Sequence, residues 1–62
     1  MSMVSILKSY EGKKVTVAMQ AYSAPMDGIL IKVTDDWFSI KTIDFNELFF
    51  DITKLVYFME RQ

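Results

Sequence analysis

The chain has 62 residues, no cysteine and no histidine, and its seven basic and eight acidic side chains give a formal charge of −1. A domain of this size buries only about 60% of its unfolded surface, and without cysteine or histidine neither a disulfide nor a Cys/His zinc site can stabilise it. The hydrophobic fraction of 52% is high for so small an interior. We therefore treat residues 1–62 as one domain and expect a homo-oligomer that covers part of its apolar surface.

Several function classes lack support in the sequence. The nearly balanced charges provide no global basic field for nucleic acid or anionic membrane. No apolar run approaches the roughly 20 residues of a membrane span, and residues 1–10 lack the pattern of an export signal, so we expect a cytoplasmic protein with no membrane partner. Without histidine or cysteine, and with no nucleophile beside a base, we expect no catalytic residues, no enzymatic activity, no metal and no cofactor.

The first predicted element is a short amphipathic helix within residues 1–11. Its apolar side chains recur at intervals of three and four residues, which is the helical period. These side chains are Met3, Ile6, Leu7 and Tyr10. Ser2 is a candidate N-cap. Gly12 is expected to end the helical region, because glycine tolerates the left-handed conformation found just past a helix.

Residues 13–60 are predicted to form five strands separated by short turns. These strands are residues 13–21, 28–33, 37–43, 48–52 and 55–60, which are rich in β-branched and aromatic side chains. The second and third strands form a hairpin around the polar tetrapeptide Val33-Thr34-Asp35-Asp36. The rest of the chain is organised around this hairpin.

Strict alternation assigns the side chains of the hairpin to its two faces. In the second strand, the side chains predicted to share one face are Ile29, Ile31 and Val33. In the third strand, Phe38 is in phase with Ile40 and is predicted to lie in the core. Trp37 is in phase with Ser39 and is predicted to reach the surface, where it would stack on a base or pack at an interface.

The last strand is predicted to be apolar on both faces. Alternation groups Leu55, Tyr57 and Met59 on one face, and Val56 with Phe58 on the other. Such a strand at the end of a small sheet is either covered on both sides or paired with a neighbouring chain. The candidate oligomer interface therefore comprises Phe49, Phe50, Leu55, Val56, Tyr57 and Phe58.

Two carboxylates, Asp35 and Asp36, lie at the hairpin turn. One hypothesis makes them ligands of a hard metal ion, with Asp27 or Asp44 joining them in space. We favour the alternative that they accept backbone N–H groups in the turn, because adjacent side chains of an extended segment point apart.

The segment Gly12-Lys13-Lys14-Val15-Thr16-Val17, followed by Gly28-Ile29-Leu30 and by Asp35 seven residues after Gly28, resembles the first motif of Sm and Sm-like (LSm, Hfq-like) proteins. With one helix and five short strands in sequence, the resemblance covers nearly the whole chain. It implies a mainly β fold, in which a short N-terminal α-helix precedes a five-stranded, strongly bent antiparallel small barrel of the SH3-like kind. In that family the glycine lets a bent strand pass close to its neighbour.

The resemblance also implies a function. Sm-like proteins form rings in which the fourth strand of one subunit pairs with the fifth of the next, and many bind single-stranded RNA through the loops after the second and fourth strands. The corresponding nucleic-acid candidates here are Asp35, Asp36, Trp37, Lys54 and Lys13. This sequence departs from the family at Phe38, where an asparagine is usual, and at Asp51, where an arginine is usual.

The alternative function is a protein-interaction or structural oligomerisation module that binds no nucleic acid. It would present Trp37, Phe45 or an exposed strand edge to a protein partner. Both functions begin from the same small β domain, and they differ in whether phosphate or protein is recognised.

Overall fold

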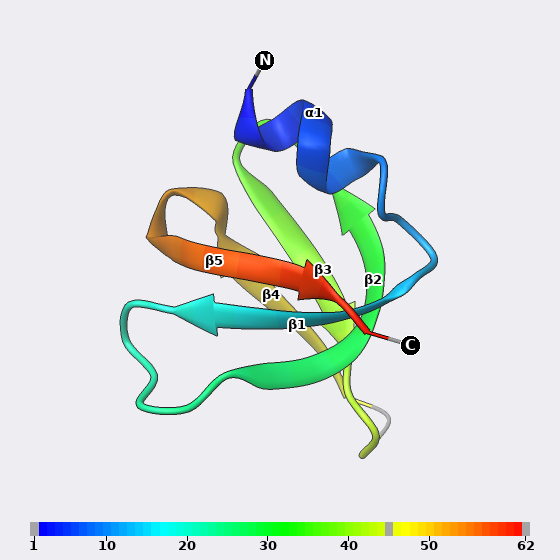
Figure 1. The fold of residues 1–62 in the computed structure, drawn as a ribbon, viewed down its shortest axis with the longest axis vertical. Coiled ribbons are helices and arrows are strands. Elements are labelled where there is room, and N and C mark those ends of the chain that lie inside the picture. The colour runs from blue at the N-terminus through cyan, green and yellow to red at the C-terminus, as the bar shows by residue number, and fades with distance from the viewer. Residues whose placement is uncertain (1, 45, 62) are drawn as a thin grey trace.

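The computed structural model describes residues 2–44 and 46–61, which form one short helix and a five-stranded antiparallel sheet (Figure 1). The elements are α1 (Met3–Lys8), β1 (Lys14–Met19), β2 (Met26–Val33), β3 (Trp37–Lys41), β4 (Glu47–Asp51), the 3-10 turn η1 (Ile52–Lys54) and β5 (Leu55–Glu60). The strand order is β4-β3-β2-β1-β5. The prediction of a mainly β protein with a short N-terminal helix and five antiparallel strands is therefore confirmed.

Strand β2 joins the two halves of the sheet. Residues 26–29 pair with β1, and residues 29–33 pair with β3. At Gly28 the neighbouring strand comes so close that an added Cβ would lie 2.6 Å from the carbonyl oxygen of Lys41 and 2.8 Å from Cγ1 of Ile40. Glycine is required here because any side chain would force β2 and β3 apart.

The core lies between the sheet and α1. Its buried apolar side chains are Leu7, Val15, Val17, Met19, Leu30, Val33, Phe38, Ile40, Phe50 and Ile52. Phe38 and Ile40 are both inaccessible to solvent, as alternation in β3 predicted. Leu7 brings α1 into this core, so the helix has the apolar support that six residues need to stay folded.

Both ends of α1 are fixed by specific residues. The side chain of Ser2 accepts a hydrogen bond from the backbone N–H of Ser5, which confirms the predicted N-cap. Gly12 has a φ of 86°, the left-handed conformation expected of it. Next to Gly12, the carboxylate of Glu11 accepts a hydrogen bond from the backbone N–H of Val33 at 2.7 Å, which holds the turn after α1 to β2.

No helix in residues 2–44 or 46–61 is long and apolar enough to cross a membrane.

The prediction that Val33 shares a face with Ile29 and Ile31 was wrong. The pairing with β3 shifts between Leu30 and Lys32, so that Ile31 is an extra residue in the ladder. Leu30 and Val33 consequently both point into the core, while Ile29 and Ile31 are exposed. An extra residue of this kind reverses the alternation beyond it, which strict period-2 counting does not detect.

The predictions that Leu55 shares a face with Tyr57 and Met59, and that Val56 shares one with Phe58, were wrong for the same reason. Its pairing with β1 shifts between Ala18 and Met19, which pair with Tyr57 and Leu55, respectively, and skip Val56. Leu55 and Phe58 pack against the core. The exposed apolar side chains of β5 are Val56, Tyr57 and Met59. The strand therefore divides into an inner pair and an outer group rather than into two regularly alternating sets.

The close approach at Gly28 predicts a specific loss of stability. We expect Gly28→Ala to lower the free energy of unfolding by about 2 kcal/mol, because the methyl group overlaps backbone atoms of β3. Lys32→Ala, an exposed position on the same strand, is the control and should change it by less than about 0.5 kcal/mol. Urea denaturation measures both, and equal stability of the two variants would contradict the proposed contact.

Candidate functional site

The strongest candidate for function is the pair of outermost strands, β4 and β5. They lie at opposite ends of the strand order, and within the described residues neither outer edge is paired with another strand. Figure 1 shows the chain passing from one edge strand to the other through η1. On β4 the side chain of Phe49 is 62% exposed. Unpaired edges that carry apolar side chains and no proline are ready templates for pairing with another chain.

The structure divides the six predicted interface residues into two groups. Phe50 is buried, and Leu55 and Phe58 pack on the core, so these three contribute their backbone to the edges but not their side chains. The side chains that remain available are those of Phe49, Val56 and Tyr57. Met59 on the same strand is also exposed, but it was not among the predicted interface residues.

A hollow of about 440 Å³ lies at the end of β4, and we call it the aromatic-acidic hollow. It is lined by Asp36, Trp37, Phe49, Phe50 and Asp51. The rings of Trp37 and Phe49 meet edge to face, with 5.3 Å between centroids. Trp37 is also the register partner of Asp51 across the β3–β4 ladder. Two of the predicted nucleic-acid residues, Asp36 and Trp37, are thus brought together with the β4 edge.

Hydrogen bonds from Thr53 favour the charged form of Asp51. Its Oδ1 accepts the Thr53 hydroxyl at 2.7 Å and the Thr53 backbone N–H at 3.0 Å. The side-chain bond, followed by the backbone bond, holds the pKa of Asp51 below its ordinary value of 3.8, and the charge of Lys54 acts in the same direction. The carboxylate at the mouth of the hollow is therefore anionic at neutral pH, and it attracts cations and repels phosphate.

The hairpin turn is organised by Thr34. Its hydroxyl oxygen accepts the backbone N–H groups of Asp36 at 3.2 Å and Trp37 at 3.0 Å. The expectation that the turn carboxylates accept these N–H groups was wrong, because Thr34 precedes them and is already within reach. The carbonyl of Asp36 accepts the N–H of Ile52 at 3.0 Å, which ties the turn to η1. Asp35 is exposed.

The two predicted lysines lie in different places. Lys54 ends η1, where its carbonyl accepts the N–H of Gln20 at 3.0 Å and its side chain is exposed. Lys13 is at the corner between α1 and β1, with Nζ 5.5 Å from the centroid of the Tyr10 ring, which itself packs edge to face on Phe58. Lys13 is not among the described residues that line the aromatic-acidic hollow.

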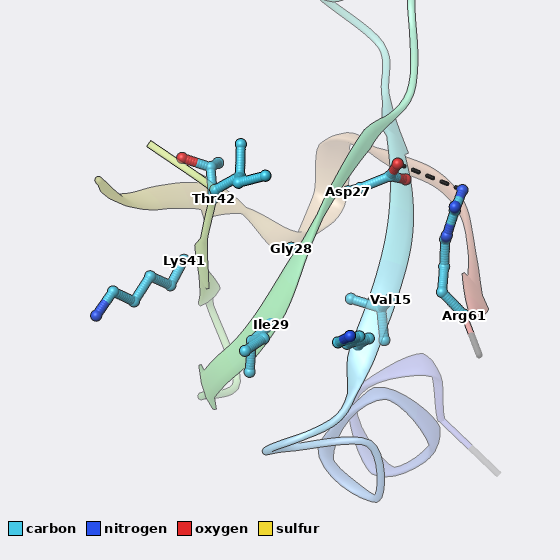
Figure 2. Close-up of a pocket in the computed structure, with 9 residues that line it drawn as sticks. Val15, Asp27, Gly28, Ile29, Lys41, Thr42 and Arg61 are labelled. Atoms are coloured by element: carbon cyan, nitrogen blue, oxygen red, sulfur yellow. Dashed lines mark ion pairs between the residues drawn. The ribbon is translucent and has the colours of Figure 1, made fainter. Parts of the chain in front are cut away.

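A second groove, of about 610 Å³, lies where β1, β2, β3 and the segment after β5 come together (Figure 2). It is lined by Lys14, Val15, Asp27, Gly28, Ile29, Lys41, Thr42, Ile43 and Arg61. Asp27 accepts the hydroxyl of Thr16 at 2.6 Å and forms an ion pair with Arg61 at 3.3 Å. The ion pair between Asp27 and Arg61 was not predicted, because residues so far apart in the chain give no local signal that they meet.

Among residues 2–44 and 46–61, no group of three or more histidine, cysteine, aspartate or glutamate side chains is placed to hold a metal ion. The predicted contact residue Phe45 lies outside the described residues.

Comparison with known proteins gives no match: no protein-family model, no curated protein and no solved structure. The similarity to Sm-like proteins therefore extends only to the architecture of a small mainly β domain, in which an N-terminal helix is followed by five antiparallel strands. The aromatic-acidic hollow and the two edge strands have to be interpreted from their own geometry.

The contact between Asp51 and Thr53 predicts an acid-dependent contribution to stability. Because the folded-state pKa of Asp51 is lowered, its hydrogen bonds stabilise the protein above a pH of about 4, and this contribution is lost as the pH falls through the folded-state pKa. We expect Thr53→Ala to raise that pKa towards 3.8, and Thr53→Ser to preserve the lowered pKa. An NMR titration of the Asp51 carboxyl carbon measures both, and an unchanged pKa in Thr53→Ala would contradict the assignment.

Proposed function

We propose that the protein is a non-enzymatic, Sm-like small barrel that assembles with copies of itself into a closed ring. In this ring, β4 of one subunit pairs with β5 of the next. The observation that carries the proposal is that the two outermost strands of one sheet both leave apolar side chains in solvent. Pairing the strands would satisfy their outer backbone groups and remove those side chains from water.

The barrel part of the proposal is supported by β2. A strand that pairs with β1 along one half and with β3 along the other must turn between them, and Gly28 lies at that point. The two β-bulges, at Ile31 and Val56, add local twist. Together these features favour a sheet that bends back over its own core.

The ring part is supported by the difference between the two edges. A contact between unlike surfaces is head to tail, so each added subunit presents a fresh β4 and a fresh β5 edge. Such a chain of contacts either continues as a filament or closes. A ring closes when a whole number of subunits, each rotated by the same angle, completes one full turn. The closed ring leaves no edge exposed to further addition.

The negative charge near the hairpin turn and the end of β4 favours protein assembly over RNA binding. The hairpin turn and the connection from the end of β4 through η1 correspond to the RNA-binding loops of the family. They carry Asp35, Asp36 and Asp51 against the single positive charge of Lys54. At a separation of about 4 Å, the repulsion between a carboxylate and a phosphate is roughly 1 kcal/mol in bulk water and about 4 kcal/mol near a protein surface. The stacking surface of Trp37 and Phe49 thus lies in a surrounding that disfavours the nucleic-acid backbone.

The proposal predicts a closed oligomer that depends on β4. Light scattering should give the mass of a defined multimer that persists in high salt, and Phe49→Lys should reduce it to a monomer by placing charge on the edge. The control is Ile43→Lys, which changes an 88% exposed side chain away from both edge strands and should leave the mass unchanged. A wild-type monomer at all accessible concentrations would overturn the proposal.

The same measurement tests RNA binding. Addition of a short U-rich or A-rich RNA should leave the mass of the wild-type oligomer unchanged, because the hairpin turn and the end of β4 carry Asp35, Asp36 and Asp51. Bound RNA whose affinity falls steeply with salt would instead favour the nucleic-acid function implied by the family resemblance.

A further inference from the structure

The aromatic-acidic hollow has the chemistry of a site for a cationic side chain. It combines the carboxylates of Asp36 and Asp51 with the rings of Trp37 and Phe49, all in one depression at the end of β4. An ammonium or guanidinium group is attracted both to carboxylates and to the faces of aromatic rings. A phosphate or carboxylate ligand would meet repulsion from both acidic groups.

The position of the hollow in the fold indicates where the cation comes from. All strand pairs within the sheet are antiparallel, and in an antiparallel pair the end of one strand lies opposite the beginning of the other. If the pairing between copies is antiparallel too, the end of β4 faces the beginning of β5 of a neighbouring copy. Asp51 is the last residue of β4, and Lys54 immediately precedes β5. The strand pairing of the proposed ring would therefore bring the neighbour's copy of Lys54 to the mouth of the hollow.

Lys54 is suited to this role by its surroundings. Its backbone is anchored by the hydrogen bond from Gln20, and its side chain is exposed. Within its own chain, Lys54 lies near enough to Asp51 to favour the charged carboxylate, but in the described part of the chain it forms no ion pair with Asp36 or Asp51. The ammonium group can thus be shared with a second subunit.

We infer that Lys54 of one subunit inserts into the aromatic-acidic hollow of the next and sets the register of the β4–β5 contact. This inference rests on the proposed ring and adds to it a specific recognition contact. An edge pairing held by backbone bonds and apolar side chains alone can slip by two residues without changing faces. A charge placed at one end of the strand penalises such slips, because each one removes the cation from its carboxylates.

A charge exchange between subunits tests the contact. Asp36→Lys is preferred to a change at Asp51, because Asp51 caps η1 and its loss would also affect folding. We expect Lys54→Glu and Asp36→Lys each to weaken assembly about tenfold or more, measured as the concentration of half-dissociation by light scattering. An equimolar mixture of the two variants should regain assembly. In the mixture, Lys54 of the Asp36→Lys variant meets an intact hollow, and the carboxylate introduced by Lys54→Glu meets the ammonium group introduced by Asp36→Lys.

Matched controls separate this contact from a general effect of charge. Lys8→Glu changes the same charge on the exposed side of α1, and Asp35→Lys changes the same charge at the residue next to Asp36, outside the hollow. Both should assemble like the wild type. Lys54→Arg should also assemble, because it keeps a cation that binds aromatic faces and carboxylates.

The outcomes distinguish the inference from the proposed ring. If the wild type assembles and both charge variants assemble equally well, the ring stands and the Lys54 contact is overturned. If each variant is weakened but their mixture does not recover, Lys54 acts within its own subunit and the inference also fails. A monomeric wild type overturns the ring and the contact together.

Discussion

The close passage of β2 against β3 at Gly28 is the constraint on which the rest of the structure depends. Because there is no side chain at this point, one strand can pair with β1 along its first half and with β3 along its second. The two halves of the sheet are thereby held over a single core that includes Leu30 and Phe38. The same arrangement makes β4 and β5 the outermost strands, so the feature that forms the core also produces the two edges.

The stability of the subunit and its proposed association with other copies depend on the same two short strands, β4 and β5. A chain of 62 residues has little interior, and β4 and β5 divide their apolar side chains between the core and solvent. Phe50 and Phe58 pack inward, whereas Phe49 and Tyr57 remain outside. Burial of the outer group against another copy would add to the stability of each subunit, as is common among domains too small to be stable alone. In the proposed ring, folding and assembly are therefore coupled.

Acidic and basic side chains gather in different parts of the sheet. Acidic groups gather where the hairpin turn meets η1, and Asp51 is kept anionic there by Thr53. The other end of β3 borders the groove that contains Lys14, Lys41 and Arg61, with Asp27 bound to Arg61. In the proposed ring, this separation of charge would favour one alignment of a neighbouring copy, and the exposed apolar side chains would supply most of the attraction.

The sequence by itself determined the helix, the number of strands and their places along the chain, the cap at Ser2 and the burial of Phe38, because hydrophobic period and turn chemistry are local signals. It did not determine the faces of Val33, Leu55 and Val56, because one extra residue in a ladder depends on the partner strand and reverses the alternation beyond it. Only the tertiary structure brought Asp36, Trp37, Phe49 and Asp51 into one hollow. These residues come from separate parts of the chain, and their meeting is decided by long-range strand pairing, which leaves no periodic pattern in the sequence.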